Sequence, residues 1–233
     1  MSLSRQDSFL RGTLDMLPLS IGAAPFGLVI GAMAADAGLN HLETLMMGGL
    51  VYAGASQFSA LGMWQTPVPV FTIIGVTLIV NLRLVLMGAA LAPHVRHLPI
   101  YCRWSFVGIL SDETWAMALR RSAERPLTTS YVFGLIFPFY VNWLFWSTLG
   151  VTFGSQVSAP EVYGFDFVFI AVFITLVMGF CKTRVNVPPL LASVGVALLA
   201  KTFLPGVWYI FMGGIAGVLV GAILHSDGVP ADD

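Results

Sequence analysis

An arginine and two adjacent acids stand in stretches where charge is otherwise rare, and they have the clearest capacity for chemistry in this chain. Arg83 follows thirty-nine uncharged positions, and Asp112 and Glu113 interrupt an apolar segment. An arginine at the centre of a membrane costs roughly 3 kcal/mol on insertion scales, so it requires a partner or a function. We expect Arg83 to pair with one of the two acids while the other gains and loses a proton, and we assign all three residues to coupling or gating.

Two simpler interpretations of these residues remain open. Arg83 can extend its long side chain toward the nearer end of its segment, where water is available. The segment that carries Asp112 and Glu113 can also lie at the membrane interface as an amphipathic helix, with both carboxylates solvated. Neither interpretation requires Arg83 to have an acidic partner.

A second candidate site is the run of small and polar residues from Tyr52 to Ser59, within the same uncharged window. A break at Gly54, with Ser56 as the N-cap, would expose the backbone amides of a half-helix. Such amides, together with the helix dipole, suit a carboxylate, and an amino acid has one. The sequence therefore predicts a substrate-binding region that comprises Gly54, Ala55, Ser56 and Gln57, with Asn81 and Arg83 from the following segment.

Ser56 also has a catalytic interpretation, because Gly-x-Ser within a membrane segment occurs in intramembrane serine proteases. That chemistry requires a histidine base at membrane depth. The four histidines all fall at the ends of the expected segments: His41, His94, His97 and His225. A non-enzymatic function is therefore expected.

The stretch Ala23-Ala24-Pro25-Phe26-Gly27 is a third candidate. Pro25 lacks an amide donor and Gly27 relaxes the backbone, so the helix is expected to kink or open near the middle of the membrane. Freed carbonyls and amides there would be available to a substrate, and we assign Pro25, Phe26 and Gly27 to binding. A kink that serves helix packing alone is the alternative.

The elements that position these residues follow from composition. Hydrophobic residues make up 57% of the chain and charged residues only 10%, and the mean hydropathy is +0.85. Soluble domains are about a quarter charged, so lipid is the expected solvent. Hydropathy and Gly/Pro breaks predict apolar segments at 14–35, 43–64, 68–92, 104–120, 128–151, 166–181, 186–203 and 206–225.

Lys and Arg near segment ends mark the cytoplasmic side. An alternating path through all the segments places the basic loops 93–103 and 121–127 on opposite sides of the membrane. The conflict disappears if segments 43–64 and 104–120 do not cross, and we predict that both are re-entrant or broken. Irregular backbone at membrane depth persists only beside protein or a water-filled cavity, which favours a transport pathway. The N-terminus is then cytoplasmic.

Several function classes are excluded or unsupported. The formal net charge of −1 gives no basis for a nucleic-acid partner. The two cysteines lack metal or disulfide spacing, so neither a metal nor a cofactor is expected. No phosphate-binding loop occurs, and no removable signal peptide is expected at the N-terminus. The predicted fold is an all-α, polytopic transmembrane protein that forms one transport domain over residues 1–233.

The ordered motifs Pro25-Phe26-Gly27, Gly54-Ala55-Ser56-Gln57-Phe58, Asn81-Leu82-Arg83 and Asp112-Glu113 resemble the AzlC/YgaZ family of branched-chain amino acid exporters. The sharpest of these motifs lie in the first half of the chain. The resemblance implies a bacterial inner-membrane subunit that exports valine, leucine or isoleucine together with a small membrane protein of the AzlD/YgaH type. A channel or importer, a structural subunit whose partner holds the site, and the serine hydrolase remain alternatives.

Overall fold

The computed structural model consists of α-helices throughout the residues that it describes, which are 8–154, 174, 187–203 and 208–226. No strand occurs within these ranges, and the predicted all-α class is confirmed. The chain divides into two compact units, Met1–Phe165 and Asp166–Asp233, and each is considered by itself. A single transport domain remains a prediction about function.

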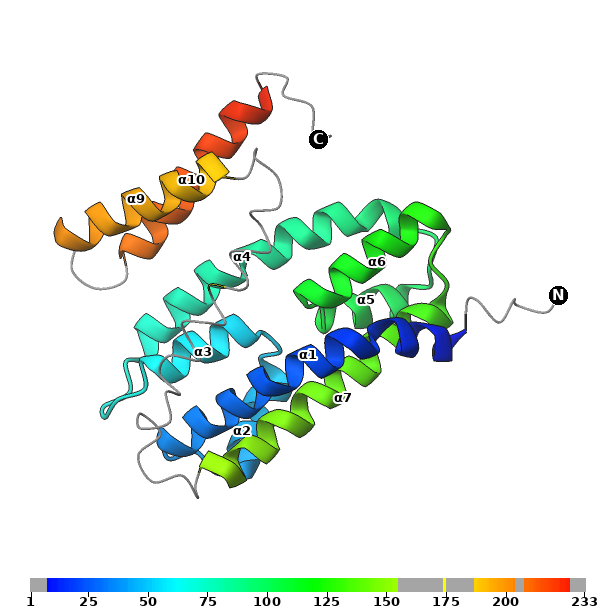
Figure 1. Ribbon diagram of the computed structural model, residues 1–233, viewed down its shortest axis with the longest axis horizontal. Helices are drawn as coiled ribbons and strands as arrows, with labels where there is room; N and C mark the ends of the chain where they lie inside the picture. The colour runs from blue at the N-terminus through cyan, green and yellow to red at the C-terminus, as the bar shows by residue number, and fades with distance from the viewer. Residues whose placement is uncertain (1–7, 155–173, 175–186, 204–207, 227–233) are drawn as a thin grey trace. The chain divides into compact units, whose positions relative to one another are not determined.

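Figure 1 shows the helices in chain order. The first unit contains α1 (Phe9–Asp36), α2 (His41–Leu50), α3 (Gly54–Gly62), α4 (Val70–Val95), α5 (Ile100–Gly108), α6 (Asp112–Glu124) and α7 (Thr129–Gly154). The second unit contains α9 (Val187–Phe203) and α10 (Trp208–Ser226).

Among the described residues, three helices are long and apolar enough to cross a membrane: α1 with 28 residues, and α4 and α7 with 26 residues each. At a rise of 1.5 Å per residue each is about 40 Å long, which exceeds the roughly 30 Å of hydrocarbon. The segments predicted at 14–35, 68–92 and 128–151 are therefore confirmed as long helices.

The two segments that were predicted not to cross are both broken. Segment 43–64 is divided into α2 and α3, of 10 and 9 residues, and segment 104–120 into α5 and α6, of 9 and 13 residues. None of these four helices exceeds about 20 Å, so none spans the hydrocarbon by itself. The prediction of broken elements is confirmed.

The two breaks are made differently. At the second, Ser111 caps α6: its Oγ accepts from the Thr114 amide at 3.3 Å, and the Ser111 amide donates to Thr114 Oγ1 at 3.0 Å. At the first, Ala53 is the N-cap of α3 and offers no side-chain hydrogen bond. The prediction of Ser56 as the N-cap is wrong, because α3 already begins at Gly54 and the Ser56 hydroxyl bonds to a neighbouring helix.

Helices α1 and α7 pack in parallel along a seam of glycines. A Cβ on Gly31 would lie 2.6 Å from the Gly150 Cα, and one on Gly154 would lie 2.6 Å from the Ala32 Cα. Near the start of both helices, Gly12 contacts the Gly134 backbone. Such close approach of backbones supplies the packing on which helix association in lipid depends.

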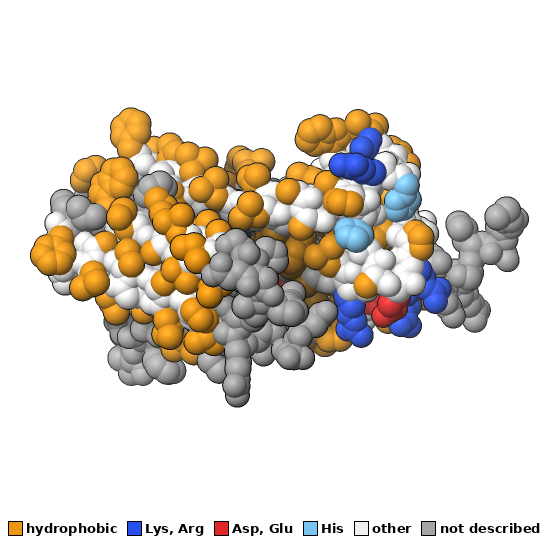
Figure 2. Space-filling model, turned by 90° about the horizontal axis from the view of Figure 1, so that it is seen from above, with side chains coloured by type: hydrophobic (Ala, Val, Ile, Leu, Met, Phe, Trp, Pro, Cys, Tyr) orange, Lys and Arg blue, Asp and Glu red, His pale blue; other side chains and the backbone are white. Residues whose placement is uncertain are grey.

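Parallel packing determines the path between these helices. The chain leaves α1 at one end of the bundle and enters α7 at the other, so it crosses back an odd number of times, and α4 provides that crossing. At the end where α1 and α7 begin, His97 Nε2 lies 2.7 Å from the Leu127 carbonyl. Loops 93–103 and 121–127 therefore lie on one side of the first unit, as predicted. Figure 2 shows the charged and histidine side chains gathered at one end of the face drawn, with hydrophobic side chains over the rest.

In the second unit, α9 and α10 form an antiparallel hairpin. Gly213 lies against Ser193 and Ala197, and Gly217 lies against Pro189 and Ser193. Helices are thus present where segments 186–203 and 206–225 were predicted. Segment 166–181 and the basic residues Lys182 and Arg184 lie outside the described residues, except for Ile174.

Candidate functional site

The middle of α4 carries the polar residues Asn81 and Arg83 on a mostly apolar helix. Arg83 is thirteen residues from Val70 and twelve from Val95, which places it about 18–20 Å from either end of the helix. An arginine side chain cannot extend that far, so the snorkelling interpretation does not fit this geometry. Arg83 requires a partner at its own depth.

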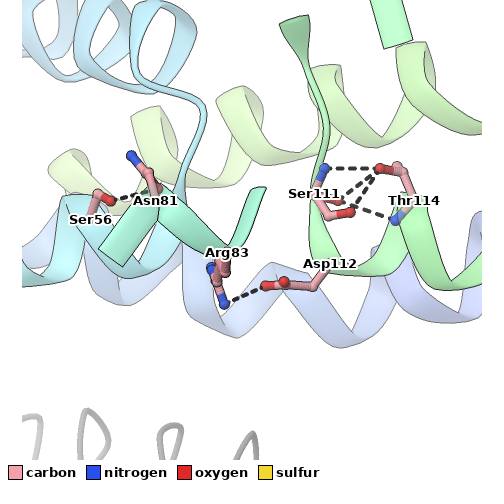
Figure 3. Close-up of polar contacts among 6 residues, drawn as sticks. All are labelled: Ser56, Asn81, Arg83, Ser111, Asp112 and Thr114. Atoms are coloured by element: carbon pink, nitrogen blue, oxygen red, sulfur yellow. Dashed lines mark hydrogen bonds and ion pairs between the residues drawn. The ribbon is translucent and has the colours of Figure 1, made fainter. Parts of the chain in front are cut away.

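That partner is Asp112, the first residue of α6. Arg83 Nη1 lies 2.9 Å from Asp112 Oδ2, and about a third of each side chain is exposed (35% and 33%). Figure 3 shows the two side chains pointing toward each other from α4 and from the break before α6. The predicted contact between Arg83 and one of the two acids is present. Burial raises the pKa of Asp112 above its ordinary value, and Arg83 partly offsets this effect.

The second acid, Glu113, does not share this ion pair. Burial raises its pKa above the ordinary value, the neighbouring Asp112 adds to the rise, and Ser111 and Arg83 counteract it. The buried Tyr52 hydroxyl, from the break between α2 and α3, lies beside Ser111 at the second break. Glu113 acts electrostatically on this hydroxyl, so the two breaks approach each other here.

Two consecutive residues of α3 connect the first break to the spanning helices. The Ser56 hydroxyl donates to Asn81 Oδ1 on α4 at 3.0 Å, as Figure 3 shows, and Trp143 Nε1 on α7 donates to Gln57 Oε1 at 3.1 Å. Ser56 and Gln57 are each only 1% exposed. Trp143 fixes the orientation of the Gln57 amide. The amide nitrogen, Gln57 Nε2, has no hydrogen-bond partner among the described residues.

The N-terminus of α3 has no side-chain cap. Because Ala53 provides no cap, no side chain satisfies the amides of the first turn, which includes Gly54 and Ala55. The Trp143 ring covers Gly54 so closely that a Cβ there would lie 2.9 Å from its Cη2 atom. Backbone amides, the helix dipole and the Gln57 amide together favour a carboxylate.

The third candidate, Pro25 to Gly27, does not form part of this arrangement. Helix α1 continues through Pro25 without interruption, so the predicted opening of the backbone is wrong. Pro25 is exposed, and a Cβ on Gly27 would lie 2.8 Å from Trp146 Cβ on α7. Dense packing against α7 keeps the helix intact, which corresponds to the packing alternative. Phe26 is half-buried within the same uninterrupted helix.

Sequence reasoning underestimated two aromatic residues. Trp143 lies on α7 near Asn142 and Trp146, and those two residues serve helix packing: Asn142 Nδ2 donates to the Ser20 carbonyl, and Trp146 Nε1 donates to Asn142 Oδ1. Trp143 instead holds Gln57. Tyr52 begins the run of small and polar residues that ends at Ser59. Its position two residues before the expected break at Gly54 was the feature that could have placed it in the site.

The geometry around Ser56 does not support a nucleophile. Its described partner is the Asn81 amide oxygen, which is not a base, whereas His41 contacts Thr152 and His97 contacts Leu127. Within the described ranges, no three His, Cys, Asp or Glu residues lie together as a metal site would require. The arrangement places an ion pair and several hydrogen-bonding groups near the midpoint of α4.

Spanning helices that surround two broken pairs, with polar groups at mid-depth, define a multi-pass membrane protein. The chain belongs to the AzlC family: the family model described as AzlC protein matches residues 18–157, from within α1 to just past the end of α7. The candidate site thus lies wholly within the matched region.

Similar proteins occur in bacteria and archaea. An uncharacterized membrane protein of Helicobacter pylori strain J99 is 26% identical over 76% of this chain and 79% of its own length. One from Archaeoglobus fulgidus is 26% identical over 78% and 80%. The inner membrane protein YgaZ of Escherichia coli K12 is 26% identical over 64% of this chain and 62% of its own length. No solved structure shows significant similarity to the chain.

Proposed function

We propose that this AzlC-family protein exports branched-chain or other hydrophobic L-amino acids by proton-coupled secondary transport, from the bacterial inner membrane and with a cytoplasmic N-terminus. The observation that carries the proposal is the meeting of two helix breaks at the midpoint of α4. There Ser56 bonds to Asn81, and Arg83 pairs with Asp112. Broken helices around a site at mid-membrane are the usual construction of secondary transporters.

The chemistry of the site fits a zwitterion with an apolar side chain. The uncapped start of α3 and the unpartnered Gln57 Nε2 suit the α-carboxylate. Glu113, near the buried Tyr52 hydroxyl, is an acid for the α-ammonium group. The Trp143 ring over Gly54 gives an apolar wall for an aliphatic side chain. Pro25, Phe26 and Gly27 are left out of this proposal.

The resemblance also motivates a small AzlD/YgaH-type membrane subunit as partner. The test is counterflow of labelled leucine in proteoliposomes that contain the full chain with and without that subunit. We expect internal leucine to accelerate uptake of labelled leucine, and valine and isoleucine to compete. Purified, monodisperse protein that shows no counterflow in either preparation would refute the proposal.

The same preparations separate the alternative functions. A channel would pass leucine down its gradient without acceleration by leucine on the opposite side. An importer would show the opposite sidedness in oriented vesicles. Peptide cleavage that is lost in Ser56→Ala would restore the hydrolase, although the Asn81 contact argues against it.

Proton coupling through Glu113 predicts a distinct pH dependence. An acid whose pKa is raised keeps its proton above its ordinary pKa of 4.5 and loses it only as the pH rises through the raised value. The side chains that act on it are Ser111, Asp112 and Arg83, and Glu113 acts in turn on the Tyr52 hydroxyl. Because the carboxylate form of Glu113 is the one that binds the α-ammonium group, the leucine exchange rate is expected to rise by about tenfold per pH unit up to that pKa and to level off above it.

Glu113→Gln, which imitates the protonated acid, is expected to flatten this profile. The matched control is Asp36→Asn, at the exposed end of α1, which is expected to keep the wild-type profile. Exchange would be measured between pH 5 and 9 at equal pH on both sides of the membrane. A Glu113→Gln profile that follows the wild type would remove Glu113 from coupling.

A further inference from the structure

A cavity of about 110 Å³ lies at the charged end of the first unit, away from the α4 midpoint. Residues of α1, α6 and α7 line it: Arg11, Asp15, Met117, Arg120, Arg121, Glu124 and Tyr131. Three arginines and two acids face one small space, which thus has one net positive charge. The ion pair of the central site uses none of these groups.

The walls of this cavity are held by contacts among all three helices. Asp15 forms an ion pair with Arg11, whose Nε lies at 3.0 Å, and accepts a hydrogen bond from the Tyr131 hydroxyl at 3.0 Å. The Arg121 guanidinium, whose side chain is 10% exposed, lies 5.0 Å from the centre of the Tyr131 ring. The polar lining is therefore organised before any ligand enters, and organised walls reduce the entropic cost of binding.

We propose that this cavity is a second binding site for the free amino-acid zwitterion, an access site at the end of the bundle. This inference rests on the proposed transport function. Arg120, which is exposed, binds the α-carboxylate, because Arg11 is paired with Asp15 and the Arg121 guanidinium lies over the Tyr131 ring. Glu124, whose contact with Arg121 is long at 3.8 Å, receives the α-ammonium group. Met117 and the Tyr131 ring form the surface for the aliphatic side chain.

Helix α6 connects this access site to the central site. Glu113, Met117, Arg120 and Glu124 are spaced by three or four residues, so they lie along one face of the helix. The nine residue steps from Asp112 to Arg121 span about 13 Å, the separation of the two sites along α6. A zwitterion that leaves the access site can therefore follow one face of α6 to Glu113.

The experiment counts leucine molecules bound by the purified full-length chain, with calorimetry in detergent. The wild type is expected to bind two leucines, and Arg120→Gln and Gln57→Leu are each expected to bind one. The matched control is Arg96→Gln, an exposed arginine of the same end that does not line the cavity, and it is expected to bind two. Size-exclusion chromatography confirms that each variant is folded.

The chemistry of the access site is tested with two ligand analogues in Gln57→Leu, because that variant is expected to have lost the central site. Leucine amide lacks the carboxylate, and 4-methylpentanoate lacks the ammonium group. Each is expected to lose at least tenfold in affinity relative to leucine. Equal affinity for all three ligands would overturn the assignment of a zwitterion site.

Other results distinguish the inference from the proposed function. A single leucine that is lost in Gln57→Leu but kept in Arg120→Gln would overturn the access site alone. No leucine bound by the wild type would overturn both. Leucine binding at the Arg120 site that phosphatidylethanolamine displaces completely at equimolar concentration would identify a lipid headgroup site instead.

Discussion

Arg83→Ala and Asp112→Asn are each expected to lower leucine efflux from cells by about tenfold or more. Either substitution leaves one charge without its partner about 18–20 Å from the ends of α4, where insertion scales assign a charged residue roughly 3 kcal/mol. The one-third exposure of both side chains reduces this penalty, so about 1.4 kcal/mol, a factor of ten, is the smallest effect expected. Efflux would be measured with labelled leucine in cells that contain equal amounts of each variant.

A double variant separates the structural from the transport contribution of the ion pair. Arg83→Ala with Asp112→Asn removes both charges, so the amount of folded protein is expected to recover while efflux stays low. Arg96→Ala, an exposed arginine of the same unit, is the control and should leave efflux unchanged. Wild-type efflux in both single variants and in the double variant would show that the pair has no part in transport.

Gly31→Ala is expected to reduce the thermal stability of the purified protein strongly. The added Cβ would meet the Ser147 carbonyl and would lie 2.6 Å from the Gly150 Cα. Both obstacles belong to backbone, which cannot rotate away, so α1 and α7 must separate at their seam. Overpacking of this kind costs about 1–3 kcal/mol, and this contact belongs at the upper end of that range. Thermal unfolding in detergent and the yield of monodisperse protein would measure the loss.

Gly22→Ala provides the matched control on the same helix. A Cβ at Gly22 meets no atom within 4 Å, and alanine has a higher helix propensity than glycine. This variant should therefore be as stable as the wild type or slightly more stable. If Gly31→Ala and Gly22→Ala unfold at the same temperature, the close α1–α7 seam is incorrect.

The broken segments were predictable because charge and length leave traces in sequence. Loops 93–103 and 121–127 are both basic, and they lie on one side only if segments 43–64 and 104–120 do not cross. The contact between Arg83 and Asp112 was predictable for a similar reason, since an isolated arginine in an apolar helix needs an acid and few acids are available.

The details that could not be predicted from the sequence depend on which neighbouring helix contacts a given side chain. Ser56 is a good N-cap residue by type, but Asn81 on α4 takes its hydroxyl. Pro25 favours a kink or break, yet packing along α7 keeps α1 helical through it. Trp143 resembles an interface tryptophan, and only the fold places its Nε1 beside Gln57. Local preference is overruled in each case by a contact between residues distant in sequence.

In the proposed transport cycle, the unpartnered Gln57 amide affects how often the empty protein closes. A buried donor without an acceptor costs about 1–3 kcal/mol, so the empty, closed carrier is less populated than the loaded one by roughly tenfold or more. A carrier that closes poorly when empty seldom returns without cargo. If transport is proton-coupled as proposed, leakage of protons through empty cycles is expected to be low, and cells that carry Gln57→Leu should dissipate their proton gradient faster when leucine is absent.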